Sequence, residues 1–137
     1  MISDRPGKVA YATVPKIGGT FNFYLNLRQA LAPLGWQVHA VTVGKVNNSW
    51  WDPQYEDDHC HRIAPNQFNC QKASEELVQW LQDHDIDILM PMSVQPAVSA
   101  IPHLPATVQT VYRCSNITRH AYDIVTEHLP YVRRVVA

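Results

Sequence analysis

Gly18, Gly19 and Thr20 form the segment of this chain that is best suited to contact a phosphate or another anion. They follow an apolar run at residues 8–14 (KVAYATV) and precede a stretch with helical periodicity. The first turn of a helix offers backbone N–H groups without intrahelical partners, and glycine lets a ligand come close to the backbone. A tight turn between a strand and a helix also uses glycine for purely steric reasons. Two hypotheses therefore stay open here, a phosphate contact and a bare turn.

Three aromatic residues, Trp50, Trp51 and Tyr55, lie in a polar segment at residues 44–58 that has no clear periodicity. Long segments between regular elements are usually functional or mobile. Flat rings stack on sugars, and polar neighbours fix the orientation of the ligand. Such neighbours are present at Asn47, Asn48 and Asp52. The segment is a candidate sugar-binding site, with the alternative that the two tryptophans anchor a long loop to the body of the domain.

The sequence His59-Cys60-His61 suggests a metal site, because alternate residues of a strand share one face. His59 and His61 could then coordinate the same ion, with Cys60 pointing away. A zinc site needs three or four ligands, however, and no second pair of ligands is spaced to complete one. The sequence therefore predicts no metal site.

Several well-known ligand motifs are missing from the chain. It has no G-x-G-x-x-G, no P-loop and no G-x-S-x-G, and no acidic residue ends the second apolar run at residues 37–43. Residues 14–16 (VPK) stand where a phospho-acceptor domain would carry acidic side chains. These absences weaken the dehydrogenase, NTPase, receiver-domain and serine-hydrolase hypotheses, and no cofactor is expected.

The composition is that of one ordinary globular domain of 137 residues, with 46% hydrophobic and 17% charged residues. The net charge is −1 and the basic residues do not cluster, so nucleic-acid binding is not expected. Cys60, Cys70 and Cys114 form no C-x-x-C pair, which favours a reducing compartment. The N-terminus does not resemble a signal peptide, and no apolar run approaches the roughly 20 residues of a membrane span. We therefore expect a cytoplasmic protein.

Apolar runs alternate with helical patterns along the whole chain. Strands are predicted at residues 8–14, 37–43, 59–63, 86–92, 107–114 and 132–137. Helices are predicted from Thr20 to a stop at Gly35, from Ser74 to His84, over residues 94–101, and from Ser115 or Asn116 to Pro130. This order predicts an α/β fold, a Rossmann-like doubly wound, mostly parallel sheet of about six strands with helices on both faces.

The last apolar run, at residues 132–137, contains Arg133 and Arg134 and ends without a turn or a polar tail. Natural domains usually end in an exposed polar stretch, so this end is interpreted as a cut. The two arginines could touch lipid head groups, which would mean peripheral contact with a membrane. Neighbouring residues of a strand face opposite ways, so a solvated edge is the alternative.

Residues 8–44, from KVAYATVPKIGG to VHAVTVG, resemble the amino-terminal domain of GT-B glycosyltransferases of family 4. Those domains begin with a strand, a Gly-Gly loop and a helix that leads through a glycine into the second strand. The counterparts here are Gly18-Gly19, Leu31, Gly35 and residues 38–41. Residues 85–89 (DIDIL) are similar to a later strand of the family, and residues 134–137 to the strand before its interdomain segment.

The resemblance implies transfer of a sugar from a nucleotide-sugar to a sugar or lipid-linked acceptor, without a required metal. In this family the amino-terminal domain holds the acceptor, and a carboxy-terminal domain, which residues 1–137 lack, holds the nucleotide through two spaced glutamates. The resemblance assigns a donor-phosphate contact to Gly18 and Gly19, and Thr20, at the expected start of the helix, completes this candidate site. Acceptor-binding candidates are Trp50, Trp51, Tyr55 and Asn116.

No catalytic residue is assigned, because Met92-Ser93 and residues 114–116 stand where some relatives carry a histidine. We therefore expect residues 1–137 to be a single, acceptor-side domain that is inactive alone. The alternative is a non-catalytic Rossmann-like domain that binds a ligand or a protein.

Overall fold

The structure is a computed structural model that describes residues 6–16, 18–92, 94–113, 123 and 126–136. Five parallel strands form the body of one sheet, in the order β3 (Cys60–Ile63), β2 (Gln37–Val43), β1 (Lys8–Ala12), β4 (Ile88–Met90) and β5 (Gln109–Arg113). A short strand, β6 (Arg134–Val136), continues the sheet beside β5, again in parallel. The predicted α/β class with a parallel sheet is confirmed.

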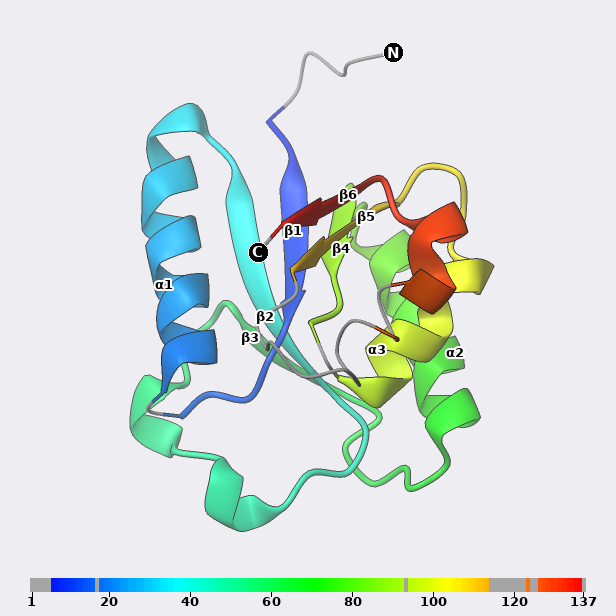
Figure 1. Ribbon diagram of the computed structural model, residues 1–137. Helices are drawn as coiled ribbons and strands as arrows, with labels where there is room; N and C mark the ends of the chain where they lie inside the picture. Colours follow the sequence, from blue (N-terminus) through cyan, green and yellow to red (C-terminus); the bar gives the residue numbers. More distant parts are fainter. Residues whose placement is uncertain (1–5, 17, 93, 114–122, 124–125, 137) are drawn as a thin grey trace.

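Helix α1 (Gly19–Leu31) lies over one face of the sheet, and α2 (Cys70–Asp83) and α3 (Gln95–Ala100) lie over the other (Figure 1). Successive side chains of β1 point to opposite faces of the sheet, as in every β-strand. Val9 and Tyr11 pack with the residues of α1, whereas Ala10 and Ala12 pack with those of α2 and α3. Both faces of the central strands are therefore buried, which explains their almost continuous apolar sequence.

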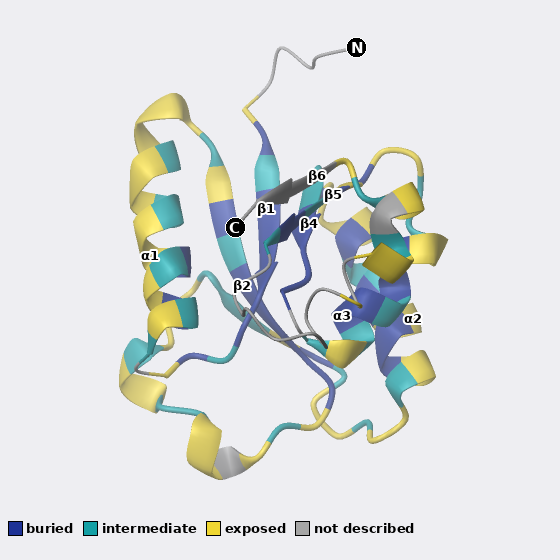
Figure 2. Cartoon of the chain, in the orientation of Figure 1, coloured by how far each residue is buried: buried dark blue, intermediate teal, exposed yellow. Residues whose placement is uncertain are grey.

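The α2 side of the core is the more completely packed. Leu77 and Leu81 of α2 have no exposed surface, and the central strands are buried throughout most of their length (Figure 2). Full burial of one leucine side chain contributes about 1.5–3 kcal/mol. Truncating either leucine to alanine should cost about 2–5 kcal/mol because a cavity would remain.

On the α1 side an open apolar groove of about 600 Å³ remains beside the helix. It is lined by α1, by the residues that follow α1 and by β1, β4 and β5, and it includes Leu27, Leu31 and Leu34. Their spacing of four and three residues is that of one face of a helix. The structure places them on one side of the groove, but Leu34 is 67% exposed.

The N-cap of helix α1 lies two residues earlier than the Thr20 expected from the sequence. Gly18, not Thr20, is its N-cap, with φ 150°, and Thr20 is the second residue of the helix, where its carbonyl accepts a hydrogen bond from Tyr11 Oη at 3.0 Å. The predicted stop of this helical segment at Gly35 is confirmed. A 3₁₀ turn that contains Pro33 follows α1, and Gly35 ends it with φ 80°.

Helix α2 begins at Cys70, four residues before the expected Ser74. The reason is the side chain of Asn69, which accepts a hydrogen bond from the backbone N–H of Lys72 at 3.0 Å and caps the helix. Ser74 is buried inside the first turns and donates to the carbonyl of Gln71. Strand β4 is shorter than residues 86–92 because Pro91 cannot donate to a neighbouring strand and Met92 has φ 52°.

The fourth predicted helix falls largely outside the described residues. Asn116, Ile117, Ala121, Ile124 and Val125 are among the residues that the structure does not describe, whereas residues 126–128 are helical. No helix within the described ranges is both long and apolar enough to span a membrane.

The strand order changes direction between β1 and β4. From β1 the chain moves outward through β2 to β3, then crosses back to β4 on the other side of β1 and continues to β5. In open parallel sheets the loops after two such neighbouring strands diverge, and ligands bind in the resulting crevice at the carboxyl ends of the strands. The candidate site is therefore sought at that edge.

Candidate binding cleft at the carboxyl edge of the sheet

A cleft of about 420 Å³ lies at this edge, between the ends of β1 and β2 and the starts of α2 and α3. Its polar and aromatic lining comes from separate loops and includes Thr42, Lys45, Trp50, Gln67, Phe68 and Gln95. Lys45 and Trp50 follow β2, Gln67 and Phe68 precede α2, and Gln95 begins α3. Together with Thr13 and Val14 after β1, four distant parts of the sequence therefore meet in one hollow.

The floor of the cleft is held by buried hydrogen bonds. Thr42 Oγ1 donates to the carbonyl of Thr13 at 2.7 Å, and the Thr13 N–H donates to the carbonyl of Val41 at 3.0 Å. Gly44 adopts φ 78°, a conformation that side chains disfavour, and its N–H donates to the carbonyl of Ile63 at 2.8 Å. These bonds fix the point at which β2 turns into the cleft wall.

The rim of the cleft presents aromatic surface to solvent. Trp50 is 54% exposed and Phe68 is 85% exposed. Exposed rings that flank polar groups are typical of recognition surfaces. The amides of Gln67 and Gln95 can both donate and accept hydrogen bonds, and Lys45 adds a positive charge. Such a lining suits a polyhydroxylated ligand with one apolar face.

Trp51 has a different role from Trp50. Its ring lies 3.8 Å from the guanidinium carbon of Arg62, and its Nε1 donates to Glu56 Oε2 at 2.9 Å. Arg62 also pairs with Glu56, at 3.7 Å. The ring face and the N–H of Trp51 are thus both engaged, although the residue lines a smaller hollow of about 240 Å³ next to the cleft. These contacts favour the anchoring hypothesis for Trp51.

Tyr55 also anchors the loop. Its ring packs edge-on against Phe21 of α1, with centroids 6.0 Å apart, and it belongs to the apolar cluster under that helix. Of the four acceptor-binding candidates, the structure therefore leaves Trp50 in the cleft and places Trp51 and Tyr55 in anchoring contacts. Asn116 lies outside the described residues.

The segment of residues 44–58 crosses the carboxyl end of β1. The N–H of Asp52 donates to the carbonyl of Pro15 at 2.8 Å, and Lys16 Nζ lies 5.4 Å from the centre of the Trp50 ring. Pro15 and Lys16 belong to the loop that leads to Gly18 and Gly19. The two sites predicted from the sequence, the glycine loop and Trp50, therefore lie along the same edge of the sheet.

Space around the glycine loop is open. Among the described residues, no atom lies within 4 Å of a methyl group added to Gly18 or Gly19, and no side chain caps the N–H groups at the start of α1. Gly18, Gly19 and Thr20 are not among the residues that line the cleft, so any anion bound there would sit beside it.

Arg113, which the sequence analysis did not single out, provides a cation on this side of the sheet. Its guanidinium carbon lies 4.0 Å from the centre of the Phe23 ring, and its Nε is buried without a hydrogen-bond partner among the described residues. Burial raises the pKa of Tyr11 to about 12, against the influence of the neighbouring Arg113. Because Tyr11 bonds to Thr20, Arg113 lies near the first turn of α1.

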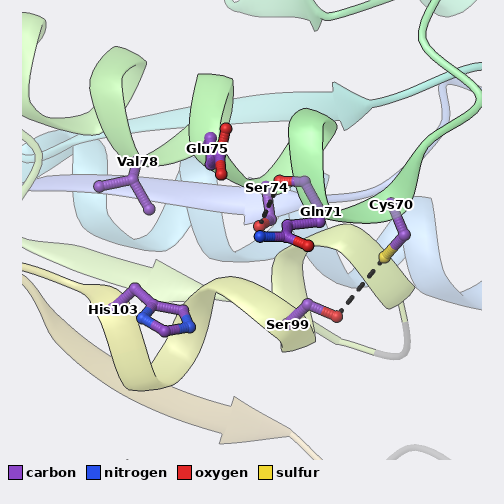
Figure 3. A pocket seen from close by; sticks show the side chains of 7 residues that line it. All are labelled: Cys70, Gln71, Ser74, Glu75, Val78, Ser99 and His103. Carbon is purple, nitrogen blue, oxygen red and sulfur yellow. Dashed lines mark hydrogen bonds between the residues drawn. The ribbon is translucent and has the colours of Figure 1, made fainter.

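A second groove, between α2 and the segment from α3 to His103, touches the cleft at Cys70 (Figure 3). Cys70 Sγ lies 3.5 Å from Ser99 Oγ. Cysteine and histidine in one groove suggest nucleophilic catalysis, but Figure 3 shows Cys70 and His103 at opposite ends. The groove therefore holds no cysteine–histidine pair.

Asp57, Asp58 and His59 bring their potential metal-ligand atoms within 4.8 Å of one another at the surface. Arg28 already forms an ion pair with Asp57. Burial acts to raise the pKa of the Asp57 carboxyl, but Arg28 and the backbone N–H of His59 together lower it. His59 Nδ1 lies 3.0 Å from Asp58 and 3.2 Å from Arg28. A cation would have to compete with this arginine, so the group offers no argument for a metal.

No protein-family model matches the sequence, and no curated protein matches it.

Proposed function

We propose that this chain is a Rossmann-like, acceptor-side domain of a glycosyltransferase, and that its carboxyl-edge cleft holds the saccharide acceptor. The observation that carries the proposal is the cleft itself, in which the exposed rings of Trp50 and Phe68 flank the amides of Gln67 and Gln95. An aromatic ring stacks on the apolar face of a sugar, and amides bind hydroxyl groups that project sideways. The cleft adjoins the crevice where the strand order reverses, which is the usual ligand position in such sheets.

The donor side of the proposed reaction lies at the start of α1. The N–H groups after Gly18, which no described side chain caps, and the guanidinium of Arg113 are both suited to a diphosphate, because each supplies donors to phosphate oxygens. Lys16 connects this side to the cleft through its contact with Trp50. A nucleotide-sugar held mainly by a second domain could thus direct its diphosphate toward α1 and its sugar toward the acceptor.

The residues of the cleft bind and orient the acceptor in this proposal. Among the described residues that line it, none carries a carboxylate or an imidazole, the groups that most often accept a proton from an acceptor hydroxyl. The chemistry therefore needs groups from outside this lining.

The lack of a carboxylate or an imidazole among the described cleft residues also favours a second candidate function, a saccharide-binding domain without catalysis. Both candidates predict saccharide binding in the cleft, but only the transferase predicts a diphosphate contact at Gly18, Gly19 and Arg113. The two functions can be separated by adding saccharide and nucleoside diphosphate in turn.

The test follows backbone and indole N–H signals by NMR while common monosaccharides and then uridine diphosphate are added at millimolar concentration. We expect a saccharide to shift the Trp50 indole signal, and the diphosphate to shift the amides of Gly18 and Gly19. Trp50→Ala should abolish the shifts that the saccharide causes in the backbone signals of Lys45, Gln67 and Gln95. Tyr131→Ala, which removes a ring that is 55% exposed elsewhere, should leave these shifts unchanged.

Equal saccharide responses in the Trp50→Ala variant and in the original protein would overturn the cleft assignment. A saccharide response without any diphosphate response would favour the non-catalytic domain.

A further inference from the structure

Four histidines gather at the amino edge of the sheet, at the opposite end of β2 from the cleft. His39 lies in β2, His59 and His61 lie at the start of β3, and His84 caps the carboxyl end of α2. Parallel pairing of β2 with β3 aligns Ala40 with Cys60, which puts His39 beside His59 and near His61. Only the sheet register and the return of α2 bring these residues together.

His39 and His61 direct ring nitrogens at each other. His39 Nδ1 lies 3.1 Å from His61 Nε2, and the ring centroids are 5.1 Å apart. Two nitrogens bound tetrahedrally to one zinc ion, each at about 2.0–2.1 Å, are about 3.3 Å apart. The observed separation thus fits a shared proton and, with a small adjustment, a shared metal ion.

The hydrogen bonds around the cluster favour a lone pair on one nitrogen of His39 and of His84. His39 Nε2 lies 3.2 Å from Gln37 Oε1, and donation to that oxygen leaves the lone pair on His39 Nδ1. His61 Nε2 then donates to His39 Nδ1, so metal binding requires the His61 proton to move to its other ring nitrogen. His84 Nδ1 donates to the carbonyl of Trp80 at 2.8 Å, which leaves the His84 Nε2 lone pair free. Metal-binding histidines are usually oriented by such bonds to carbonyl or carboxylate oxygens.

His84 is within reach as a third ligand. Its ring centroid is 6.4 Å from that of His61. Three imidazoles bound to one tetrahedral ion have centroids about 5.2 Å apart, so an approach of about 1 Å is required. His84 is exposed at the end of its helix and stacks on Trp80 at 4.2 Å, so its ring can slide without disturbing the core.

His59 does not complete this set. Its ring stacks on His39 at an interplanar angle of only 21°, so the nitrogens of the two rings do not converge on one point. Its Nδ1 is already engaged by Asp58 and Arg28. His59 and His61, which the alternation of a strand places on one face, are therefore not the pair that the geometry favours.

We propose that His39 and His61, with His84 as the third ligand, form a binding site for a divalent transition metal of the zinc, copper or nickel type. Imidazole nitrogens suit these ions, and a three-histidine set leaves a fourth position open to water or to another ligand.

The positive charge of Lys8 disfavours binding of a metal ion at this site. Lys8 Nζ donates to the carbonyl of His84 at 3.3 Å, and its charge contributes to the low pKa of His39. A long, exposed lysine side chain can turn toward water, so it reduces the affinity of the site without blocking it.

The experiment titrates untagged protein with Zn²⁺, Cu²⁺ and Ni²⁺ separately by calorimetry, and follows the imidazole ¹⁵N signals by NMR. We expect one equivalent of metal and changes at His39 Nδ1 and His61 Nε2. Loss of a supporting bond to a metal ligand weakens binding about 10–100-fold, so loss of a ligand in His39→Gln or His61→Gln should cost at least as much. His84→Gln should cost less, and His103→Gln, outside the cluster, should change nothing.

Unchanged affinity in the His39→Gln/His61→Gln variant, or ¹⁵N changes confined to other histidines, would overturn the proposal. The NMR result on the original protein decides the matter even if a variant fails to fold. Because the site lies at the end of β2 remote from the cleft, its failure would leave the proposed saccharide site untouched.

Discussion

Thr42 on β2 donates its buried hydroxyl to the carbonyl oxygen of Thr13, at 2.7 Å, and thereby joins the ends of two neighbouring strands beneath the cleft. Thr110 on β5 offers the opposite case. It is only 1% exposed, yet its Oγ1 has no hydrogen-bond partner among the described residues. Both threonines are buried, but only Thr42 forms a hydrogen bond through its hydroxyl within the described part of the chain. Comparing substitutions at the two positions therefore measures how much one buried hydrogen bond contributes to the free energy of unfolding.

We expect Thr42→Val to lower the free energy of unfolding by about 1–3 kcal/mol, because the carbonyl of Thr13 would lose its donor inside the protein. Thr110→Val should be neutral or stabilising, since it replaces an unsatisfied hydroxyl with a methyl group. Urea unfolding of both variants provides the measurement. Equal destabilisation by the two substitutions would contradict the assignment of the bond.

Gly18 and Gly19 differ in backbone conformation although both lie in open space. Gly18 has φ 150°, whereas Gly19 begins α1 without a positive φ. Gly18→Ala should destabilise the fold by about 1–2 kcal/mol through backbone strain. Gly19→Ala should be neutral or stabilise it by up to about 1 kcal/mol, because alanine favours the helix. Thermal unfolding of both variants tests this, and a larger loss in Gly19→Ala would show that the helix start is misplaced.

Stability should also depend on pH through His39. Burial first, and then the neighbouring His61, His59, Lys8 and His84, lowers its pKa to about 4, from an ordinary value near 6.5. The unfolded chain therefore binds a proton more readily than the folded one between these values. Above about pH 6.5 His39 is neutral in both states and costs no stability. As the pH falls from 6.5 toward 4, the unfolded chain gains a proton at His39 that the folded protein does not, so the free energy of unfolding decreases.

Since His39 is only partly buried, solvent screening should limit this loss to on the order of 1–2 kcal/mol. Denaturant unfolding of the original protein and of His39→Gln, at several pH values from 7.5 down to 4, measures it. The variant should show a flatter dependence. Parallel curves for the two proteins would mean that other groups dominate acid unfolding.

The sequence was sufficient where local chemistry decides the structure. The bounds of β2 were predicted correctly because every residue of QVHAVTV after the first contributes to a strand packed on both faces. Gly35 ended the first helical segment as expected, because only glycine readily takes its left-handed conformation. The predicted start of α2 at Ser74 was wrong, because the side chain of Asn69 caps a helix that begins at Cys70.

The two sites depend on contacts that no local pattern reveals. Trp50 could be recognised as a candidate, but Gln67 and Phe68 join it only because the segment before α2 returns to the end of β2. His39 was read simply as part of a strand. Its approach to His61 follows from the register of β2 with β3, which depends on the packing of the whole sheet.

Trp50 and Trp51 should respond differently to truncation. Trp51→Ala removes a ring stacked on Arg62 and an N–H bonded to Glu56, so it should loosen residues 44–58. Hydrogen exchange of these residues should speed up in that variant. Trp50→Ala should leave exchange nearly unchanged while abolishing the saccharide response. The reverse pattern would assign the anchoring role to Trp50.

Nucleotide-sugar should bind this domain alone only weakly, and no turnover should follow. The start of a helix contributes about 0.3–1 kcal/mol to an anion at an exposed site and up to about 2 kcal/mol when it is partly buried. A Kd of 1 mM already requires about 4 kcal/mol.

The guanidinium of Arg113 adds a charge-assisted bond, worth about 1.5–3 kcal/mol at most, so the total approaches the millimolar range without passing it by much. Calorimetry with common nucleotide-sugars, on the original protein and on Arg113→Gln, is the measurement. We expect a Kd near or above 1 mM that weakens by about tenfold in the variant. Micromolar binding would place the nucleotide site in this domain, and the cleft would then hold the donor and not the acceptor.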